Sequence, residues 1–398
     1  IDISRSQNNK IIVGADLLLS EKIGLIENKR LGIVTNHTAI LSNGSHLVDE
    51  LLTKDRIVIT ALFGPEHGIR GAAPAGIKID HSVDSKTNLP VYSLYGKEKK
   101  PTKEMLKNVD LLIFDIQDIG ARFYTYISTL FYTIQAAAEN NIPVIVLDRP
   151  NPIGGIRVEG PITKKDYESF VGIAPIPIQH GMTVGELAKY FVGEKLIGNN
   201  LKSELTIIEI KNWGRELFFD ETQLKWINPS PNIQSLEAAI AYPGTCLLEG
   251  TNISEGRGTD SPFLMFGAPF INSKELLLEL KRRNIIGINF SEVTFTPISI
   301  EGIAKNPKYE NTKCYGIKIS VTDRYNFNAV KFGVELISAL HKLYPTEFKF
   351  REKSFDLLTG DSEIRKMIAE NKPVEKIFDY WKNDLETFIV RQKNYLLY

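Results

Sequence analysis

The sequence has no excess of charge of either sign, because its 398 residues contain 48 Lys and Arg and 48 Asp and Glu. Without net charge the chain has no overall field that would attract a phosphate backbone or an anionic membrane surface. It also lacks any run of about 18 apolar residues, the length that a transmembrane helix requires. Its longest apolar stretches, such as residues 144–147, have the length of buried strands. We therefore expect neither nucleic-acid binding nor a membrane span.

Cysteine is scarce, with only Cys246 and Cys314 in the whole chain. Two cysteines in a protein of this size do not form a disulfide framework, so we expect two buried free thiols. The sequence begins with Ile1 rather than Met, which indicates that an N-terminal segment was removed by a signal peptidase or by design of the expressed chain. This start is compatible with export.

Several catalytic motifs are also absent. The sequence contains no G-x-G-x-x-G after its first predicted strand, no Walker A loop, no G-x-S-x-G elbow and no H-E-x-x-H. Hydride transfer, P-loop phosphoryl transfer, elbow-type ester hydrolysis and zincin chemistry therefore lose support. Five residues with irregular spacing could still meet in space as oxygen and nitrogen ligands of a metal: His67, Asp115, Asp118, Asp148 and His180. We expect no metal and no other cofactor.

The sequence does contain a regular alternation of short apolar runs and amphipathic stretches. It predicts strands at residues 31–35, 57–63, 90–94, 110–114, 143–147 and 205–210, and helices at 46–52, from Thr102, at 126–140 and at 184–192. Thr183 and Glu186 form a predicted capping box on the last of these helices. Strands that are apolar on both faces and separated by helices predict a mostly parallel sheet covered on both sides, a doubly wound α/β fold.

The length and composition of the chain favour two domains. Strict alternation fades after a segment rich in Pro and Asn, residues 226–232, and one short helix. We place the boundary near Pro243, which gives a catalytic α/β domain over residues 1–243 and a smaller α+β domain over residues 244–398. The second domain is predicted to contain helices at 273–283, 329–343 and 374–383, and a strand at 315–322.

Polar side chains follow the predicted strands at the point where each strand ends. In open α/β sheets, ligands bind outside the carboxyl ends of the strands, so these positions are candidates for a site. Each has a structural alternative, since Asp148 could stabilise a turn and Asn36 could cap the next element. Four strand ends nevertheless bring polar groups to one edge of the sheet, which predicts an active site there: Asn36 and His37, Glu66 and His67, Asp115, Gln117 and Asp118, and Asp148 and Arg149.

Glu66 stands out because it lies between Gly64-Pro65 and Gly68. The proline restricts the backbone before Glu66, and the glycine after it allows a sharp turn. The turn therefore presents the carboxyl in a fixed direction. A glycosidase needs a proton donor and usually a second carboxylate. We predict Glu66 as the acid/base, with Asp115 or Asp118 as the second group and the adjacent His67 as a further candidate. Two alternatives stay open: one aspartate could hold Arg122 in an ion pair, and an acetamido group of the substrate could itself attack.

A second polar cluster follows the predicted boundary and contains Glu249, Asn252, Glu255 and Arg257. The glycines beside Arg257 allow the backbone to approach a ligand, and an arginine fork suits a carboxylate. The alternative is an exposed, mobile loop. Residues 122–126 similarly offer aromatic faces to a sugar ring, unless Phe123 and one of the tyrosines belong to the core.

Long motifs occur in the first two thirds of the chain: GIVTNH at residues 32–37, GPEHGIRG at 64–71, DIQDIGARFY at 115–124, DRPNP at 148–152, QHGMT at 179–183, NPSPN at 228–232, EGTN at 249–252 and EGRG at 255–258. They resemble the bacterial exo-β-N-acetylmuramidase family called NamZ, formerly a domain of unknown function. The resemblance implies a Rossmann-like N-terminal domain without a nucleotide, a smaller C-terminal domain and a cleft between them. It also matches Glu66 to the glutamate associated with catalysis in that family.

The resemblance further implies an exo-acting hydrolase that releases terminal β-linked N-acetylmuramic acid (MurNAc) from the non-reducing end of peptidoglycan fragments, in the periplasm or outside the cell. Arg257 or Arg149 is available to pair with the lactyl carboxylate of muramic acid. Two other functions remain open, a metal-assisted cell-wall amidase or esterase and a module that binds cell-wall sugars without cutting them. The predicted substrate-binding residues are Asn36, His37, Arg70, Gln117, Arg122, Tyr124, Asp148, Arg149, His180, Asn232, Glu249, Asn252, Glu255 and Arg257.

An exo-acting enzyme needs a pocket that is blocked at one end, and the edge of a parallel sheet supplies only its floor. We therefore expect residues 249–260 to close over the strand ends and to bring Arg257 near Glu66.

Overall fold

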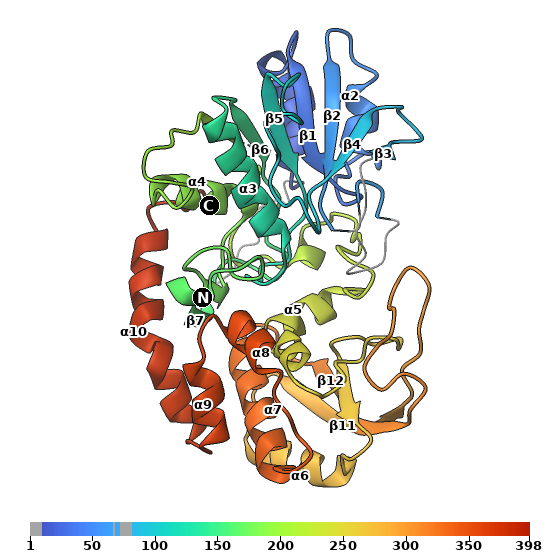
Figure 1. The fold of residues 1–398 in the computed structure, drawn as a ribbon, viewed down its shortest axis with the longest axis vertical. Coiled ribbons are helices and arrows are strands. Elements are labelled where there is room, and N and C mark those ends of the chain that lie inside the picture. The colour runs from blue at the N-terminus through green and yellow to red at the C-terminus, as the bar shows by residue number, and fades with distance from the viewer. Residues whose placement is uncertain (1–9, 67, 72–81) are drawn as a thin grey trace.

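A seven-stranded sheet lies at the centre of the N-terminal half (Figure 1). The computed structural model describes residues 10–66, 68–71 and 82–398. The strand order is β3-β4-β2-β1-β5-β6-β9, and all neighbours run parallel except β3 and β4. The strands are β1 (Arg30–Thr35), β2 (Val58–Gly64), β3 (Ser82–Val83), β4 (Pro90–Ser93), β5 (Leu111–Asp115), β6 (Val144–Leu147) and β9 (Leu205–Ile208). The predicted α/β fold is confirmed.

Helices cover both faces of this sheet, which explains why its strands are apolar on both sides. The helices α1 (Gly14–Glu21) and α2 (Leu47–Leu51) pack on one face, and α3 (Tyr126–Glu139) and α4 (Val184–Gly193) pack on the other. Successive side chains of β5 alternate between the two cores. Leu111 and Ile113 belong to the core with α1 and α2, whereas Leu112 and Phe114 belong to the core with α3 and α4.

One of the two predicted helix starts is confirmed and the other is wrong. The capping box of α4 is present: Thr183 Oγ1 accepts from the Glu186 amide at 3.2 Å, and the Thr183 amide donates to Glu186 Oε2 at 2.9 Å. The helix expected from Thr102 does not form, and the segment that follows consists of turns. The Thr102 hydroxyl accepts from the Met105 amide at 3.4 Å and the Leu106 amide donates to the Thr102 carbonyl at 3.1 Å, so the start signal forms one turn that is not continued into a helix.

The C-terminal half contains a three-stranded antiparallel sheet with the order β10-β12-β11. Its strands are β10 (Met265–Ala268), β11 (Ile288–Phe295) and β12 (Cys314–Val321), and its helices are α5 (Leu236–Thr245), α6 (Ser273–Arg282), α7 (Ala329–Leu343), α8 (Glu352–Thr359), α9 (Glu363–Ala369) and α10 (Val374–Gln392). The predicted boundary near Pro243 lies within α5. Two of these helices, α8 and α9, were not predicted, and α10 is longer than expected.

The end of the chain returns to the N-terminal half. Figure 1 shows α10 running back along the molecule toward α4, and α10 packs on β7 (Glu159–Ile162), which pairs with β8 (Pro177–Gln179). The Tyr395 hydroxyl donates to Glu194 at 2.7 Å, and the Tyr398 hydroxyl donates to Asp148 Oδ2 at 2.7 Å. The two halves are therefore joined by contacts of the tail as well as by α5. Among the described residues, four short 3₁₀ helices complete the fold: η1 (Ile23–Leu25), η2 (Lys165–Tyr167), η3 (Phe219–Glu221) and η4 (Cys246–Gly250).

The predictions on cysteine and on membrane spans can be compared with the structure. Cys246 and Cys314 are both buried free thiols, as expected. In the part of the chain that the structure describes, no helix combines the length and the apolar composition needed to cross a membrane.

Candidate active site

A cleft of about 210 Å³ lies between the two halves of the protein. Side chains from both halves line it: Glu66, Tyr95, Phe123, Tyr124, Thr125, Tyr126, Val171, Ser230 and Ile233 come from the segments before α5, and Tyr242, Glu249, Arg257 and Phe263 come from α5 and the segments after it. The structure thus brings four predicted site residues together, Glu66, Tyr124, Glu249 and Arg257. The segment from Glu249 supplies the second wall. Of the strand ends expected beneath it, the one with Glu66 lines the cleft, whereas Asn36, Asp115 and Asp148 are not among the described lining residues.

Glu66 is placed by a tight turn directly after β2. The strand ends at Gly64, and the Gly68 amide donates to the Pro65 carbonyl at 3.0 Å. Gly68 has a φ of 71°, a left-handed conformation that glycine adopts without steric cost. Gly71, with a φ of 72°, approaches His37 so closely that a Cβ atom there would lie 2.6 Å from the imidazole Cγ. The predicted catalytic candidate His67 lies outside the described residues.

Tyr95 is a cleft residue that the sequence analysis did not identify. It follows β4, which is the neighbour of β2 in the sheet, and its hydroxyl hydrogen-bonds with Glu66. Burial raises the pKa of Tyr95, and the nearby Glu66 carboxylate raises it further. Tyr95 therefore remains protonated and donates to Glu66. The available signal was its position just beyond a predicted strand.

Aromatic rings form much of the cleft wall, as expected for residues 122–126. Tyr124 contacts Tyr126 edge-to-face with the ring centroids 4.8 Å apart, and it contacts Tyr242 at 6.0 Å. Tyr242 in turn packs against Phe263 at 4.7 Å. Burial raises the pKa of both Tyr124 and Tyr242, so these rings stay neutral. An apolar, uncharged surface of this kind suits the face of a sugar ring.

Arg257 is held at the cleft by carboxylates. It donates to Glu249 Oε1 from Nε at 3.1 Å and from Nη2 at 2.7 Å, and its Nε lies 3.5 Å from Glu255. Lys308 pairs with the other oxygen of Glu255 at 2.9 Å. Burial alone would lower the pKa of Arg257, but the carboxylates of Glu249 and Glu255 outweigh it and raise the pKa. Arg257 is therefore a fixed, permanently charged cation, and its side chain is 26% exposed.

The two aspartates proposed as the second catalytic group differ in their surroundings. Asp115 is fully buried and forms a bidentate pair with Arg149, from Nε at 2.6 Å and from Nη2 at 2.9 Å. The pair engages both oxygens of the carboxylate with one cation. The alternative in which an aspartate pairs with Arg122 is wrong, because the Arg122 terminal nitrogens donate to backbone carbonyls of Pro161, Ile176 and Leu358.

Asp118 has one oxygen without a hydrogen-bond partner among the described residues, although it does not itself line the cleft. Its Oδ2 accepts from the Gly120 amide at 2.8 Å and lies 3.6 Å from His180 Nε2. His180 Nδ1 accepts from the Met182 amide at 3.1 Å, which assigns the ring proton to Nε2 on the side of Asp118. Asp118 Oδ1 is buried and has no hydrogen-bond partner among the described residues. A carboxyl oxygen in this state can accept a hydrogen bond from a group that comes close to it.

Comparison with known proteins identifies the family. Models of the exo-β-N-acetylmuramidase NamZ match the chain in two parts, the N-terminal domain over residues 31–237 and the C-terminal domain over residues 240–398. The chain belongs to the NamZ family. The peptidoglycan β-N-acetylmuramidase NamZ of Bacillus subtilis (strain 168) is 47% identical over 390 residues, which cover 98% of this chain and 92% of that protein. The resemblance inferred from the motifs is confirmed.

Two crystal structures of DUF1343 family proteins from Bacteroides fragilis NCTC 9343 share the fold of this NamZ-family chain. One is 35% identical with a TM-score of 0.90, and the other is 37% identical with a TM-score of 0.78. Both comparisons cover 98% of this chain and 99% of the other. The two NamZ domains meet at residues 237–240, within α5.

Most other predicted binding residues of this NamZ-family chain contact its own backbone or charged groups. Asn36 accepts from Thr38, His37 bonds to the Asn228 carbonyl, Gln117 donates to the carbonyls of Asp118 and Pro150, Asn232 donates to the Ile303 carbonyl, and Asn252 bonds to the backbone of Glu347 and Lys349. Gln117 and Arg149 line a separate pocket of about 310 Å³. These contacts favour structural roles.

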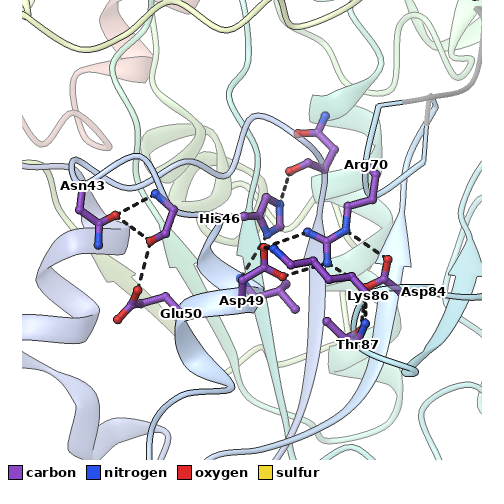
Figure 2. A network of polar contacts seen from close by, with 11 residues as sticks. Asn43, His46, Asp49, Glu50, Arg70, Asp84, Lys86 and Thr87 are labelled. Carbon is purple, nitrogen blue, oxygen red and sulfur yellow. Dashed lines mark hydrogen bonds and ion pairs between the residues drawn. The ribbon is translucent and has the colours of Figure 1, made fainter.

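Asp148 and Arg70 also have extensive contacts within the protein. Asp148 accepts from the Gly185 amide and from the hydroxyls of Thr183 and Tyr398, so it fixes the start of α4. Burial raises the pKa of Asp148 to about 7 despite these donors. Arg70 pairs with two aspartates in the network shown in Figure 2.

Of the residues considered for a metal site, Asp118 and His180 are neighbours, with Oδ2 and Nε2 3.6 Å apart. Across residues 10–66, 68–71 and 82–398, no group of three or more His, Cys, Asp and Glu side chains is arranged to hold a metal ion. Asp115 pairs with Arg149, and Asp148 caps α4.

Proposed function

We propose that this protein is an exo-acting glycoside hydrolase that releases terminal β-linked MurNAc from the non-reducing end of peptidoglycan fragments. One observation carries the proposal: Glu66 lies in the cleft between the two halves, in a NamZ-family chain, together with the cation Arg257. The similarity to a peptidoglycan β-N-acetylmuramidase over nearly the whole chain supports it.

In the mechanism that we propose, Glu66 gives its proton to the glycosidic oxygen as the bond from that oxygen to the anomeric carbon breaks. The Tyr95 hydroxyl holds the Glu66 carboxyl by a hydrogen bond. Afterwards Glu66 is ionised and can take a proton from the attacking water. The turn after β2 and the hydrogen bond from Tyr95 together orient this group before the substrate arrives.

We assign the second role to Asp118 rather than Asp115. Asp115 is bound by Arg149 through both oxygens, whereas Asp118 Oδ1 has no partner in the described part of the protein. His180 lies beside the other oxygen of Asp118 and orients it. Asp118 then either activates the water or orients the substrate acetamido group as that group attacks the anomeric carbon.

We expect Arg257 to select MurNAc through its lactyl carboxylate. Replacing Arg257 by Met should lower kcat/KM on an aryl MurNAc glycoside by about 10- to 100-fold, the loss expected for one charge-assisted hydrogen bond. The rate on the matched aryl GlcNAc glycoside, which has no lactyl group, should change little. Arg365→Met is a suitable control, because Arg365 forms a comparable pair with Asp356 but does not line the cleft. Equal rates of the unmodified protein on the two glycosides would contradict this role.

Incubation with the disaccharide MurNAc-GlcNAc, followed by analysis of the products, tests the proposed function directly. We expect free MurNAc and free GlcNAc as the products. They show which bond is cleaved, from which end of the substrate, and which sugar is released. Binding without release would favour a module that only recognises cell-wall sugars. Loss of activity with EDTA and its recovery with added metal would favour the metal-assisted amidase or esterase.

We also propose that the protein acts in the periplasm or outside the cell. Its proposed substrates derive from peptidoglycan, which lies outside the cytoplasmic membrane. Immunodetection in fractionated cells should find the protein outside the cytoplasm, and a signal confined to the cytoplasmic fraction would contradict this location.

A further inference from the structure

We propose that Arg70 is a positioning residue for Glu66, which it fixes relative to α2 and to the β3–β4 hairpin. The inference rests on the proposed function, in which Glu66 is the proton donor. Arg70 follows Glu66 by four residues, beyond the turn that the Gly68 amide and the Pro65 carbonyl close. Its side chain ties the segment that directly follows this turn to two other segments of the fold.

The guanidinium of Arg70 lies between two carboxylates (Figure 2). It donates to Asp84 from Nε at 3.1 Å and from Nη2 at 2.8 Å, and to Asp49 from Nη1 at 3.2 Å and from Nη2 at 3.0 Å. Bidentate pairs of this kind restrict both distance and orientation. All three nitrogens of the guanidinium are thus engaged by the protein, which argues against the substrate-binding role expected from the sequence.

The two aspartates that bind Arg70 are themselves held by other contacts. Asp84 is 5% exposed and accepts from the Thr87 amide at 3.2 Å and from the Thr87 hydroxyl at 2.7 Å. Asp49 belongs to α2 and also pairs with Lys86 at 2.5 Å. Hydrogen bonding to Asp84 raises the pKa of Arg70, and Arg70 in turn lowers the pKa of Asp84. The pair therefore stays ionised at every pH where the protein is expected to work.

The β3–β4 hairpin holds the Glu66 turn at two places. Asp84 lies in its connecting turn and binds Arg70, and Tyr95 follows β4 and hydrogen-bonds with the Glu66 carboxyl. The backbone of the turn and the side chain of the acid are thus held by one element. Displacing the turn relative to β4 would move the proton donor relative to the sugar bound in the cleft. A shift of about 1 Å in a catalytic group can cost on the order of 100-fold in rate.

A double-mutant cycle with the disaccharide MurNAc-GlcNAc tests this role. We expect Arg70→Met to lower kcat by about 10- to 100-fold, with KM within about twofold of that of the unmodified protein. In the Glu66→Gln background the same replacement should lower kcat by less than about threefold, because a residue that acts through Glu66 has no further effect once the acid is lost. Lys86→Met is the matched control: it removes an ion pair from Asp49, leaves both pairs of Arg70 in place, and should keep kcat near that of the unmodified protein.

Two further variants keep the test decisive if Arg70→Met does not fold. Asp84→Asn preserves the size of the side chain that binds Arg70 and should also lower kcat. Arg70→Lys should recover part of the activity that Arg70→Met loses. Three results would each overturn the inference. They are a normal kcat in folded Arg70→Met, a loss confined to KM, and a double variant in which the losses of kcat from the two single replacements multiply in full. If Glu66→Gln itself keeps near-normal turnover, the assignment of the acid fails and the inference fails with it.

Discussion

Glu66→Gln should lower turnover of MurNAc-GlcNAc by at least about 100-fold, the lower range for removal of a general acid. Glutamine has nearly the size of glutamate and can retain the hydrogen bond with Tyr95, but it has no proton to give to the leaving oxygen. The cleft should therefore keep its shape while the bond-breaking step slows. Steady-state kinetics of the purified variant, together with circular dichroism and thermal unfolding, measure both parts of this result.

The leaving group supplies an internal control for this prediction. An aryl MurNAc glycoside with an acidic phenol as leaving group needs little protonation, so Glu66→Gln should impair its cleavage much less than cleavage of the disaccharide. Glu301→Gln, which changes an exposed carboxyl of the other half, should leave both rates unchanged. Near-normal turnover of the disaccharide by Glu66→Gln would show that Glu66 is not the acid.

Arg149→Met should cost about 3–5 kcal/mol of unfolding free energy, the range for removing one partner of a buried ion pair. The loss arises because Asp115, which is 0% exposed, would be left as an uncompensated charge at the carboxyl end of β5, opposite Thr35 of β1. Urea denaturation of the variant and of the unmodified protein measures the difference.

Two further variants distinguish the effect of leaving a buried charge unpaired from the effect of losing an ion pair alone. Arg30→Met breaks the pair with Asp110, in which the two side chains are 47% and 43% exposed, and should cost far less unfolding free energy than Arg149→Met because solvent screens an exposed pair. The double variant Asp115→Leu/Arg149→Met should be more stable than Arg149→Met alone, because no buried charge is left unpaired. A loss below about 1 kcal/mol for Arg149→Met would contradict the burial of this pair.

Arg122 illustrates the limit of reading a site from one motif. It stands beside aromatic residues in a long family motif, and the sequence therefore favoured substrate binding. In the structure it is fully buried, and it binds backbone carbonyls contributed by Pro161, Ile176 and Leu358. Burial lowers the pKa of Arg122 to about 9. Two of its partners lie in or beside the β7–β8 ribbon, and the third lies in the last turn of α8. No local pattern near residue 122 indicates these contacts.

Tyr95 is the opposite case, a cleft residue that the motifs did not mark. Its hydrogen bond with Glu66 depends on β4 lying beside β2, with Gly64 opposite Ser93 in the parallel register. Strand order is a property of the sheet as a whole, and short apolar runs do not encode it. The position of Tyr95 just beyond a predicted strand was the one available signal.

The sequence by itself determined the features that depend on local patterns. Strands that are apolar on both faces predicted the covered parallel sheet. Thr183 and Glu186 predicted the cap of α4, and the glycines around Glu66 predicted its turn. These outcomes depend on residues within a few positions of one another. Only the tertiary structure decided which polar side chains remain available for a ligand, because the partners that bind Arg149, Arg70 and Arg122 lie between 14 and 236 residues away in the chain. A charged side chain in a motif looks the same in the sequence whether it contacts a ligand or a buried carboxylate, and long-range packing alone separates the two.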